Sequence, residues 1–482
     1  MGQFPVISIS LKDSGAKDFV SACSMLRSII GNEAMRFQFL KESGGLTNED
    51  KARYDQLIKV DVSGQQGFIM ALETLTDSLQ VLSGLLQKHY GKKVIVLIDE
   101  YDVPLDMAQK AGYYDDMVDL MRNLFGRVLK TNDSLHFAVL TGCLRVAKES
   151  FFTGLNNLRV LSVSDAEYDE HFGFTDGEVR TMLEYYGCSG KYELVRTWYD
   201  GYRFGDADVY CPWDVINYCA KLRTDPDALP KSFWINTSGN EIIRQFLQKA
   251  GQSTRRELEK LIDGESVGKK INQELTYKDL FKSIDNLWSV LFTTGYLIQR
   301  GKSEGRVFQL AIPNLEIKEI FIEQILEWFQ EEVYRDTPKL DAFCATFPKA
   351  DARAVEENFN SYLQRTISIR DTSVRRDMKE NFYHEILLGL LSHREDWNIN
   401  SNAESGDGYS DILVEIEEDQ VGIVIEVKYP DSSNLDSGCR KALEQIEKMG
   451  YESRLRQDGM KTIIKYGIAC AKKECRVMIA ES

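Results

Sequence analysis

The sequence lacks the cysteine and histidine patterns of a disulfide-bonded or zinc-organised protein. It contains nine cysteines and five histidines in 482 residues, and all are dispersed. The number of cysteines is odd, and none form a C-x-x-C pair. Neither a disulfide framework nor a zinc ribbon is therefore expected, and the pattern favours reduced, mostly buried thiols.

Long apolar runs are also missing. No stretch approaches the roughly 20 apolar residues that a helix needs to cross a bilayer. The first residues, MGQFPVISIS, have no positively charged region before their apolar run, as a signal peptide would. Val6 stands where a myristoylation signal has Ser or Thr. These absences predict a cytoplasmic protein without membrane contact.

An excess of basic residues is absent as well. The formal net charge is -16, which argues against a protein that coats nucleic acid through its whole surface. The 43% of hydrophobic and 28% of charged residues are typical of a soluble globular protein. Two segments remain candidates for a local basic groove, although a solvated surface of mixed charge explains either one equally well. They contain Arg365, Arg370, Arg375, Arg376 and Lys379, and Lys461, Lys465, Lys472, Lys473 and Arg476.

The first third of the sequence alternates apolar strand-like runs with amphipathic helical stretches. Near-continuous apolar strands separated by helices predict a parallel sheet with helices on both faces. The chain as a whole is too long for one core, so two or three domains are expected. The predicted strands are 5–9, 94–98, 136–140 and 160–163, and the predicted helices are 70–87 and 115–130.

The middle region, from about residue 233 to residue 334, is predicted to be mostly helical. Two strand-like runs at 296–300 and 306–310 flank a turn with two glycines, which predicts a hairpin. Helices followed by a hairpin resemble a winged helix. Because no candidate recognition helix is basic, we expect it to dock another domain. An amphipathic helix is predicted over residues 317–334.

A further α/β unit of about 100 residues is predicted to begin near residue 379. The overall fold class is therefore α/β: a parallel sheet, a helical, winged-helix-like middle region and a separate C-terminal α/β domain. The predicted domains are 1–232, 233–378 and 379–482. In the last one, helices are predicted at 382–391 and 439–449, and strands at 412–416, 422–429, 462–469 and 476–480.

Asp99 and Glu100 come directly after the apolar run 94–98. Side chains at the carboxyl edge of a parallel sheet face the crevice in which ligands bind. In P-loop NTPases an acid at this place, the Walker B position, holds the magnesium ion of the nucleotide. Glu100 would then polarise the attacking water. Other α/β enzymes also end a strand in an acid, so this pattern leaves both interpretations open.

The phosphate-binding loop G-x-x-x-x-G-K-[ST] that should accompany such an acid is absent. The Gly-Lys-Ser tripeptide at 301–303 lies in the predicted hairpin turn, and Tyr296 stands where the first glycine is required. It is a false match. ATP is therefore expected to bind only if such a loop is restored upstream of residue 1.

Three longer motifs are LIDEYD (97–102), LTGCLRVAKES (140–150) and WYDGYRFG (198–205). Together they resemble a prokaryotic family of AAA-ATPase-like proteins with a C-terminal PD-(D/E)XK nuclease-like domain, and the similarity covers nearly the whole chain. The resemblance implies an α/β fold with a P-loop NTPase-like parallel sheet and a restriction-endonuclease-like C-terminal domain. Members of that family carry an Arg-rich phosphate-binding loop upstream of the segment that matches residues 5–13. We expect this sequence to begin after that loop.

The resemblance also assigns roles within these motifs. It implies that Thr141 senses the nucleotide and that Arg145 lies nearby. Alternatively, Thr141 caps a turn and Arg145 pairs with an acid. The third motif is expected to be structural, with Gly201 and Gly205 in turn conformations and the aromatic residues packed as a lid.

A D…E-x-K pattern lies in the predicted C-terminal domain. Asp411 opens one strand, and Glu426 and Lys428 lie on the same face of the next. Charged groups on so apolar a strand are costly to bury unless a partner or a metal ion compensates them. Two carboxylates suit Mg²⁺ or Mn²⁺, which activates a water, while the lysine stabilises developing charge. The alternative is a structural salt bridge of Lys428 with Glu426 or Asp411.

The resemblance to the PD-(D/E)XK fold adds two helical residues to this candidate site. It implies that Glu385 supports the metal ion and that Gln445 orients the lysine or the substrate. The predicted catalytic set is therefore Glu385, Asp411, Glu426, Lys428 and Gln445, with Asp411 and Glu426 as metal ligands. Ser410 replaces the proline of the family name.

Three hypotheses for the function follow. The first is a metal-dependent nuclease domain on an ATPase-like module, with nucleic acid, DNA in the first place, as its partner. The second is an ATP-binding regulatory switch. The third is a non-enzymatic interaction protein in which both sites are vestigial, and an oligomer is compatible with each of them.

Overall fold

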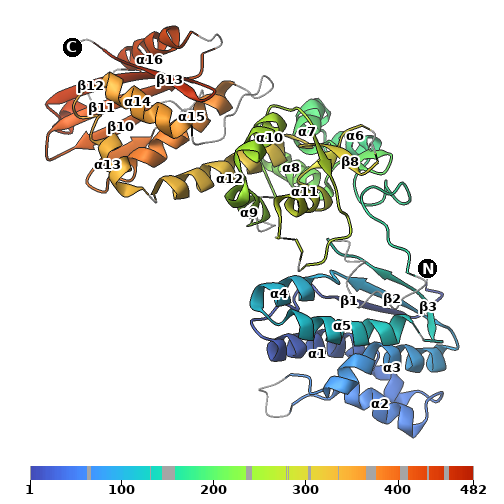
Figure 1. Ribbon diagram of the computed structural model, residues 1–482. Helices are drawn as coiled ribbons and strands as arrows, with labels where there is room; N and C mark the ends of the chain where they lie inside the picture. Colours follow the sequence, from blue (N-terminus) through green and yellow to red (C-terminus); the bar gives the residue numbers. More distant parts are fainter. Residues whose placement is uncertain are drawn as a thin grey trace. The chain divides into compact units, whose positions relative to one another are not determined.

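The structure of the protein is a computed structural model, which forms two compact units (Figure 1). The first contains residues 1–167 and 270–295, and the second contains 168–269 and 296–482. The predicted boundaries at 232 and 378 both lie inside the second unit and stay predictions. The structure describes residues 2–61, 67–130, 132–143, 158–234, 241–277, 279–280, 282–301, 305–334, 336–364, 376–401, 411–430, 434–449 and 455–480.

The first unit contains a parallel sheet in the order β1-β2-β3, which confirms three predicted strands. Helices α1, α3 and α5 lie along one face of it, and both predicted helices are present as α3 and α5 (Figure 1). The P-loop arrangement itself stays a prediction. The elements are β1 (Val6–Ser10), α1 (Phe19–Met35), η1 (Gln38–Glu42), α2 (Asn48–Ile58), α3 (Leu72–Tyr90), β2 (Val94–Asp99), α4 (Val103–Ala111), α5 (Tyr114–Leu129), β3 (Leu135–Leu140) and α11 (Ile284–Thr293).

One detail of the sheet differs from the prediction, and another stays a prediction. Phe137 and Val139 of β3 are 47% and 45% exposed, and the cover of both faces by helices stays a prediction. Residues 160–163 form no strand. A short apolar run can be a strand or an extended loop, and periodicity alone does not decide between them.

The first part of the second unit is mainly helical. The predicted hairpin is confirmed, because Ile298 pairs with Ala311 in antiparallel register, and the amphipathic helix at 317–334 is present as α12. The winged-helix interpretation stays a prediction. The elements are α6 (Asp176–Tyr185), η2 (Ser189–Lys191), α7 (Tyr192–Tyr199), β4 (Tyr202–Phe204), β5 (Ala207–Val209), α8 (Pro212–Thr224), α9 (Glu241–Lys249), α10 (Gln252–Ile262), β6 (Val267–Lys270), β7 (Ile298–Gln299), β8 (Val307–Ala311) and α12 (Leu315–Tyr334).

The two glycines of the WYDGYRFG motif have the turn conformations that the sequence predicts. Gly201 has φ +101° and Gly205 has φ +49°. A Cβ atom on Gly201 would lie 2.2 Å from the backbone oxygen of Pro313, so both the conformation and the space require glycine. Tyr199 of the same motif is fully buried in the hydrophobic core around α8.

The C-terminal part of the second unit contains a mixed sheet in the order β13-β12-β11-β10-β9. β10 and β11 are antiparallel, and β11 and β12 are parallel. All four predicted strands and both predicted helices are present, whereas β9, α13 and α14 were not predicted. The elements are α13 (Thr337–Cys344), α14 (Ala352–Leu363), α15 (Arg376–Leu391), β9 (Asn398–Ser401), β10 (Asp411–Ile416), β11 (Val421–Lys428), α16 (Leu435–Met449), β12 (Thr462–Ala471) and β13 (Glu474–Ile479).

The helices of the described residues were also compared with the length and hydropathy of a membrane span. None of them is long and apolar enough to cross a bilayer.

Candidate active site

Glu426 and Lys428 meet at the end of β11. They are two residues apart on one strand and therefore share a face of the sheet. Lys428 Nζ lies 2.6 Å from Glu426 Oε1, and the Glu426 side chain is 0% exposed. The predicted charged pair is thus a buried ion pair on a strand whose other residues are mostly apolar and buried.

A second carboxylate reaches the same lysine from α15. Glu380 Oε2 lies 3.7 Å from Lys428 Nζ, and Glu380 Oε1 accepts a hydrogen bond of 3.1 Å from the backbone N–H of Tyr429. No motif in the sequence indicated this residue. The helical spacing contained the signal, because Glu380 is in phase with Tyr383 and Leu387, which are both fully buried.

Glu385 is not brought to this cluster. Its side chain is 50% exposed, and its Oε1 lies 3.9 Å from His384 Nδ1. Partial burial raises the pKa of Glu385, and full burial lowers the pKa of His384 to about 4, so the imidazole is neutral at pH 7. The role of Glu385 stays a prediction.

Asp411 is the register partner of Glu426 in the antiparallel ladder of β10 and β11. Its backbone is therefore next to the candidate site, while its side chain lies outside the described part. Gln445 is half-buried on α16, which packs against β11 and β12. The catalytic roles of both residues stay predictions.

The donor set fits a divalent cation. Glu426 Oε2 is buried and accepts no hydrogen bond from any described residue. A buried carboxylate oxygen without a donor is costly, and a hard cation that prefers oxygen ligands would remove that cost. No group of three or more metal-binding side chains is present among the residues searched, which do not include the Asp411 side chain.

The other predicted site lies at the carboxyl edge of the parallel sheet. Asp99 ends β2, and Thr141, directly after β3, donates a hydrogen bond from Oγ1 to Asp99 Oδ1. Burial and the nearby charges of Asp102 and Asp99 raise the pKa of Glu100, whose φ of +55° is unusual for a residue other than glycine. Arg145 lies outside the described residues. Nucleotide binding by these residues stays a prediction.

Asp102 links several segments at the carboxyl edge of the parallel sheet. No role for this residue was predicted from the sequence. It is buried, and its Oδ2 accepts hydrogen bonds from the Cys143 N–H at 3.1 Å and from the Tyr277 hydroxyl at 3.0 Å. These bonds join the loops after β2 and β3 to the segment 270–295. They explain in part why this segment folds with the first unit.

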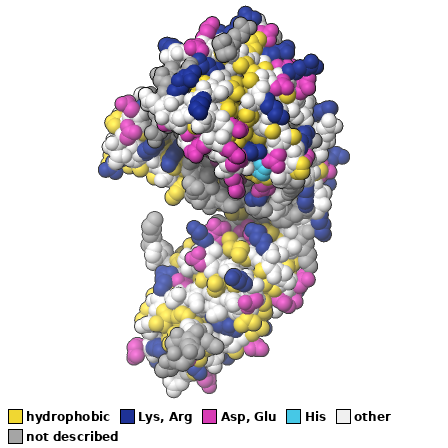
Figure 2. Space-filling view, turned by 90° about the vertical axis from the view of Figure 1, so that its left-hand side faces the viewer, with side chains coloured by type: hydrophobic (Ala, Val, Ile, Leu, Met, Phe, Trp, Pro, Cys, Tyr) yellow, Lys and Arg dark blue, Asp and Glu magenta, His cyan; other side chains and the backbone are white. Residues whose placement is uncertain are grey.

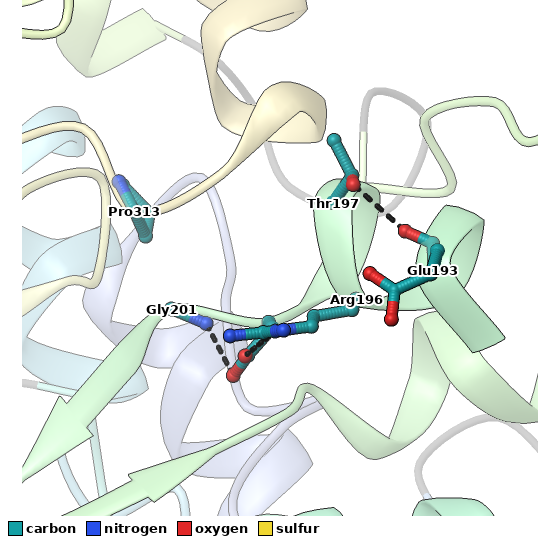
Figure 3. A pocket seen from close by; sticks show the side chains of 6 residues that line it. Glu193, Arg196, Thr197, Gly201 and Pro313 are labelled. Carbon is teal, nitrogen blue, oxygen red and sulfur yellow. Dashed lines mark hydrogen bonds and ion pairs between the residues drawn. The ribbon is translucent and has the colours of Figure 1, made fainter.

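Figure 3 shows a separate pocket of about 340 Å³ in the second unit, between the end of α7 and the residues after β8. Asp200 accepts a hydrogen bond of 2.7 Å from the Gly201 N–H, and burial raises the pKa of Asp200. The pocket contains none of the predicted site residues. It is lined by Glu193, Arg196, Thr197, Asp200, Gly201 and Pro313.

Three basic residues of the second basic segment are paired with acids. In the second segment, Lys465 pairs with Glu447 at 2.7 Å and Lys473 pairs with Glu259 at 2.7 Å. Arg476 forms ion pairs with Glu356 and Asp436. Of the first segment, the structure describes only the Lys379 side chain. On the face shown in Figure 2, basic and acidic side chains are interspersed.

A buried carboxyl pair lies in the first part of the second unit. Asp214 of α8 and Glu316 of α12 are both fully buried. Glu316 Oε1 accepts hydrogen bonds from the N–H groups of Phe233 and Trp234 at 2.6 and 3.0 Å. Burial first, and then the charge of Glu316, raises the pKa of Asp214 to about 8.

We expect this pair to make stability depend on pH. The folded state holds a proton on Asp214 that the unfolded state releases near pH 4, so unfolding becomes easier as pH rises toward about 8. Asp214→Asn should keep the neutral form and flatten the decline of the melting temperature between pH 6 and pH 8, as measured by calorimetry. Asp227→Asn, a change at an exposed acid, should retain the wild-type slope. Parallel curves for wild type and Asp214→Asn would contradict this account.

Comparison with known families gives matches for two regions of the chain. Residues 378–480 match the family model of the PD-(D/E)XK nuclease superfamily, and residues 1–152 match that of a predicted AAA-ATPase. The chain therefore joins a predicted AAA-ATPase region to a region of the PD-(D/E)XK nuclease superfamily, as the resemblance implied.

One curated relative is the "Uncharacterized protein in vnfD 5'region" of Azotobacter chroococcum mcd 1. It is 28% identical over 258 residues, which are 52% of this chain and 46% of that protein. The match thus spans less than half the length of the relative. No solved structure matches this chain significantly.

Proposed function

We propose that residues 376–480 form a metal-dependent nuclease domain that hydrolyses phosphodiester bonds of nucleic acid. The observation that carries this proposal is Glu426, a fully buried carboxylate with one oxygen that accepts no hydrogen bond from a described residue. Lys428 contacts its other oxygen, and Asp411 is its register partner. The match of residues 378–480 to the nuclease superfamily supports the assignment.

Each residue has a defined task in this proposal. Asp411 and Glu426 would hold Mg²⁺ or Mn²⁺, which supplies an activated water and neutralises charge on the phosphate when bound. Lys428 places its ammonium beside the same carboxylate and stabilises negative charge that develops on a phosphate oxygen. Glu380 orients Lys428 and fixes the end of β11 through the Tyr429 N–H.

The two acids of α15 give a direct test of these roles. We expect Glu380→Gln to lower the cleavage rate by roughly 10- to 100-fold, the usual effect of removing a group that orients a ligand at a metal site. Glu385→Gln should change it little, because that side chain is 50% exposed and lies beside His384, whereas Glu380 lies beside Lys428. Initial rates on labelled DNA at saturating Mn²⁺ would measure both. The reverse ranking would favour the acid predicted from the sequence.

The activity itself is tested with duplex DNA, single-stranded DNA and RNA, each incubated with the full chain and Mg²⁺ or Mn²⁺. Cleavage of at least one substrate that stops on addition of EDTA is expected. Absence of cleavage for all three substrates with both metals would contradict the proposed function.

A further inference from the structure

Helix α10 places a carboxylate against the turn between β12 and β13. Glu259 is 3% exposed, and its Oε1 lies 2.7 Å from Lys473 Nζ. The turn is fixed to the candidate active site, because the Tyr383 hydroxyl of α15 donates a hydrogen bond of 2.6 Å to the Lys472 carbonyl. An acid outside residues 376–480 therefore neutralises a lysine next to the helix that carries Glu380.

A second carboxylate of the same helix end lies near the end of β11. Asp263 caps the carboxyl end of α10, and after burial its charge is a cause of the raised pKa of Tyr429. Tyr429 follows Lys428 directly and stacks on Tyr383 with ring centroids 6.2 Å apart. Lys379 Nζ lies 4.9 Å from the centre of the Tyr429 ring. Glu259 of α10 thus contacts Lys473, and the charge of Asp263, which caps this helix, acts on Tyr429 beside the candidate active site.

We propose that Lys379, Tyr429 and Lys473 form the surface that binds the nucleic-acid backbone beside the active site, and that Glu259 and Asp263 cover this surface in an autoinhibited state. The inference rests on the proposed nuclease function, since it names the regulation of the same site. Carboxylate and phosphate oxygens are both strong acceptors for a lysine ammonium. Lys473 cannot form a full ion pair with Glu259 and with a phosphate at the same time. Helix α10 therefore has to move away before the substrate binds Lys473.

Glu259 is buried, so its ion pair with Lys473, which we call the latch, differs from an exposed ion pair. Exposed ion pairs contribute little to stability, but a buried carboxylate that loses its partner carries an uncompensated charge. Displacement by nucleic acid alone is therefore unfavourable. If the whole of α10 moves, Glu259 returns to water. The lysines are then uncovered without leaving a buried carboxylate unpaired.

The experiment measures binding in EDTA, where metal-dependent cleavage does not occur, by the fluorescence anisotropy of a labelled DNA duplex with the full chain. The variant Glu259→Gln with Asp263→Asn should bind roughly tenfold more tightly than wild type, with a salt dependence steeper by about one unit of log Kd per log salt. Adding Lys473→Gln should cancel most of the gain. Asp263→Asn alone gives a second, milder variant if the double variant does not fold.

Glu257→Gln is the matched control. It removes one negative charge from the same helix, as each of the two substitutions above does, but Glu257 pairs with Lys269 at 2.7 Å instead of Lys473. An equal gain in this control, or no gain in either acid-to-amide variant of the latch, overturns the inference. A loss of thermal stability without tighter binding also overturns it. Tighter binding without cleavage in Mg²⁺ or Mn²⁺ would instead contradict the proposed function and leave the covered surface supported.

Discussion

Replacing Lys428 by glutamine is expected to lower nucleic-acid cleavage by at least about 100-fold, the usual effect of removing one donor that stabilises developing charge. The ammonium contacts Glu426 at 2.6 Å, so its loss removes the positive charge nearest to the carboxylate assigned to the metal ion. Glutamine can still donate a hydrogen bond to Glu426. The measurement is the initial rate of cleavage with excess Mn²⁺.

Glutamine keeps a hydrogen-bond donor beside Glu426 but removes the charge of the lysine, so the melting temperature is measured together with the rate. Lys428→Ala would leave Glu426 and Glu380 without their shared cation, and breaking a buried pair costs about 3–5 kcal/mol. Lys441→Gln, at an exposed position of α16, is the control for a lost positive charge in the same region. If Lys428→Gln melted like wild type and cleaved at the wild-type rate, Lys428 would have no part in the chemistry.

Gly201→Ala is expected to destabilise the second unit by about 2–4 kcal/mol, well above the typical effect of a point mutation. The backbone at Gly201 has φ +101°, and the new Cβ atom would lie 2.2 Å from the Pro313 carbonyl oxygen. Neither the conformation nor the contact can be relieved by a side-chain rotation, so the backbone has to shift. Figure 3 shows both residues at the edge of the same pocket.

The matched substitution for this prediction is Gly190→Ala. No atom lies within 4 Å of a Cβ built at Gly190, so its effect should stay within about 1 kcal/mol. Denaturant unfolding followed by circular dichroism measures both variants. Equal unfolding midpoints would show that the contact between Gly201 and Pro313 is absent in solution.

The features that could be predicted from the sequence are those set by a single segment of the chain, such as one strand. The apolar runs that became β2, β10 and β11 were bounded clearly enough to be recognised as strands. Alternation along β11 was sufficient to place Glu426 and Lys428 together. For α2, the T-x-x-D signal at Thr47 and Asp50 was present and forms a capping box, yet it was not used.

Features that depend on packing between distant segments were not predicted. Glu380 reaches Lys428 only because α15 packs against β11, and its helical phase alone does not reveal that neighbour. Asp214 and Glu316 lie on two helices far apart in the sequence, and nothing local to either residue indicates a buried carboxyl pair. Periodicity shows which face of a helix is buried, but it does not identify the partner.

The central claim is that Glu426 belongs to a metal site, and Mn²⁺ binding measured by electron paramagnetic resonance tests it most directly. We predict that the wild-type chain binds Mn²⁺ and that Glu426→Gln, which keeps the side-chain shape and removes its charge, loses at least about tenfold in affinity. Asp214→Asn, which removes a carboxyl from a different buried pair, should bind like wild type. Equal Mn²⁺ affinity of wild type and Glu426→Gln would contradict the account.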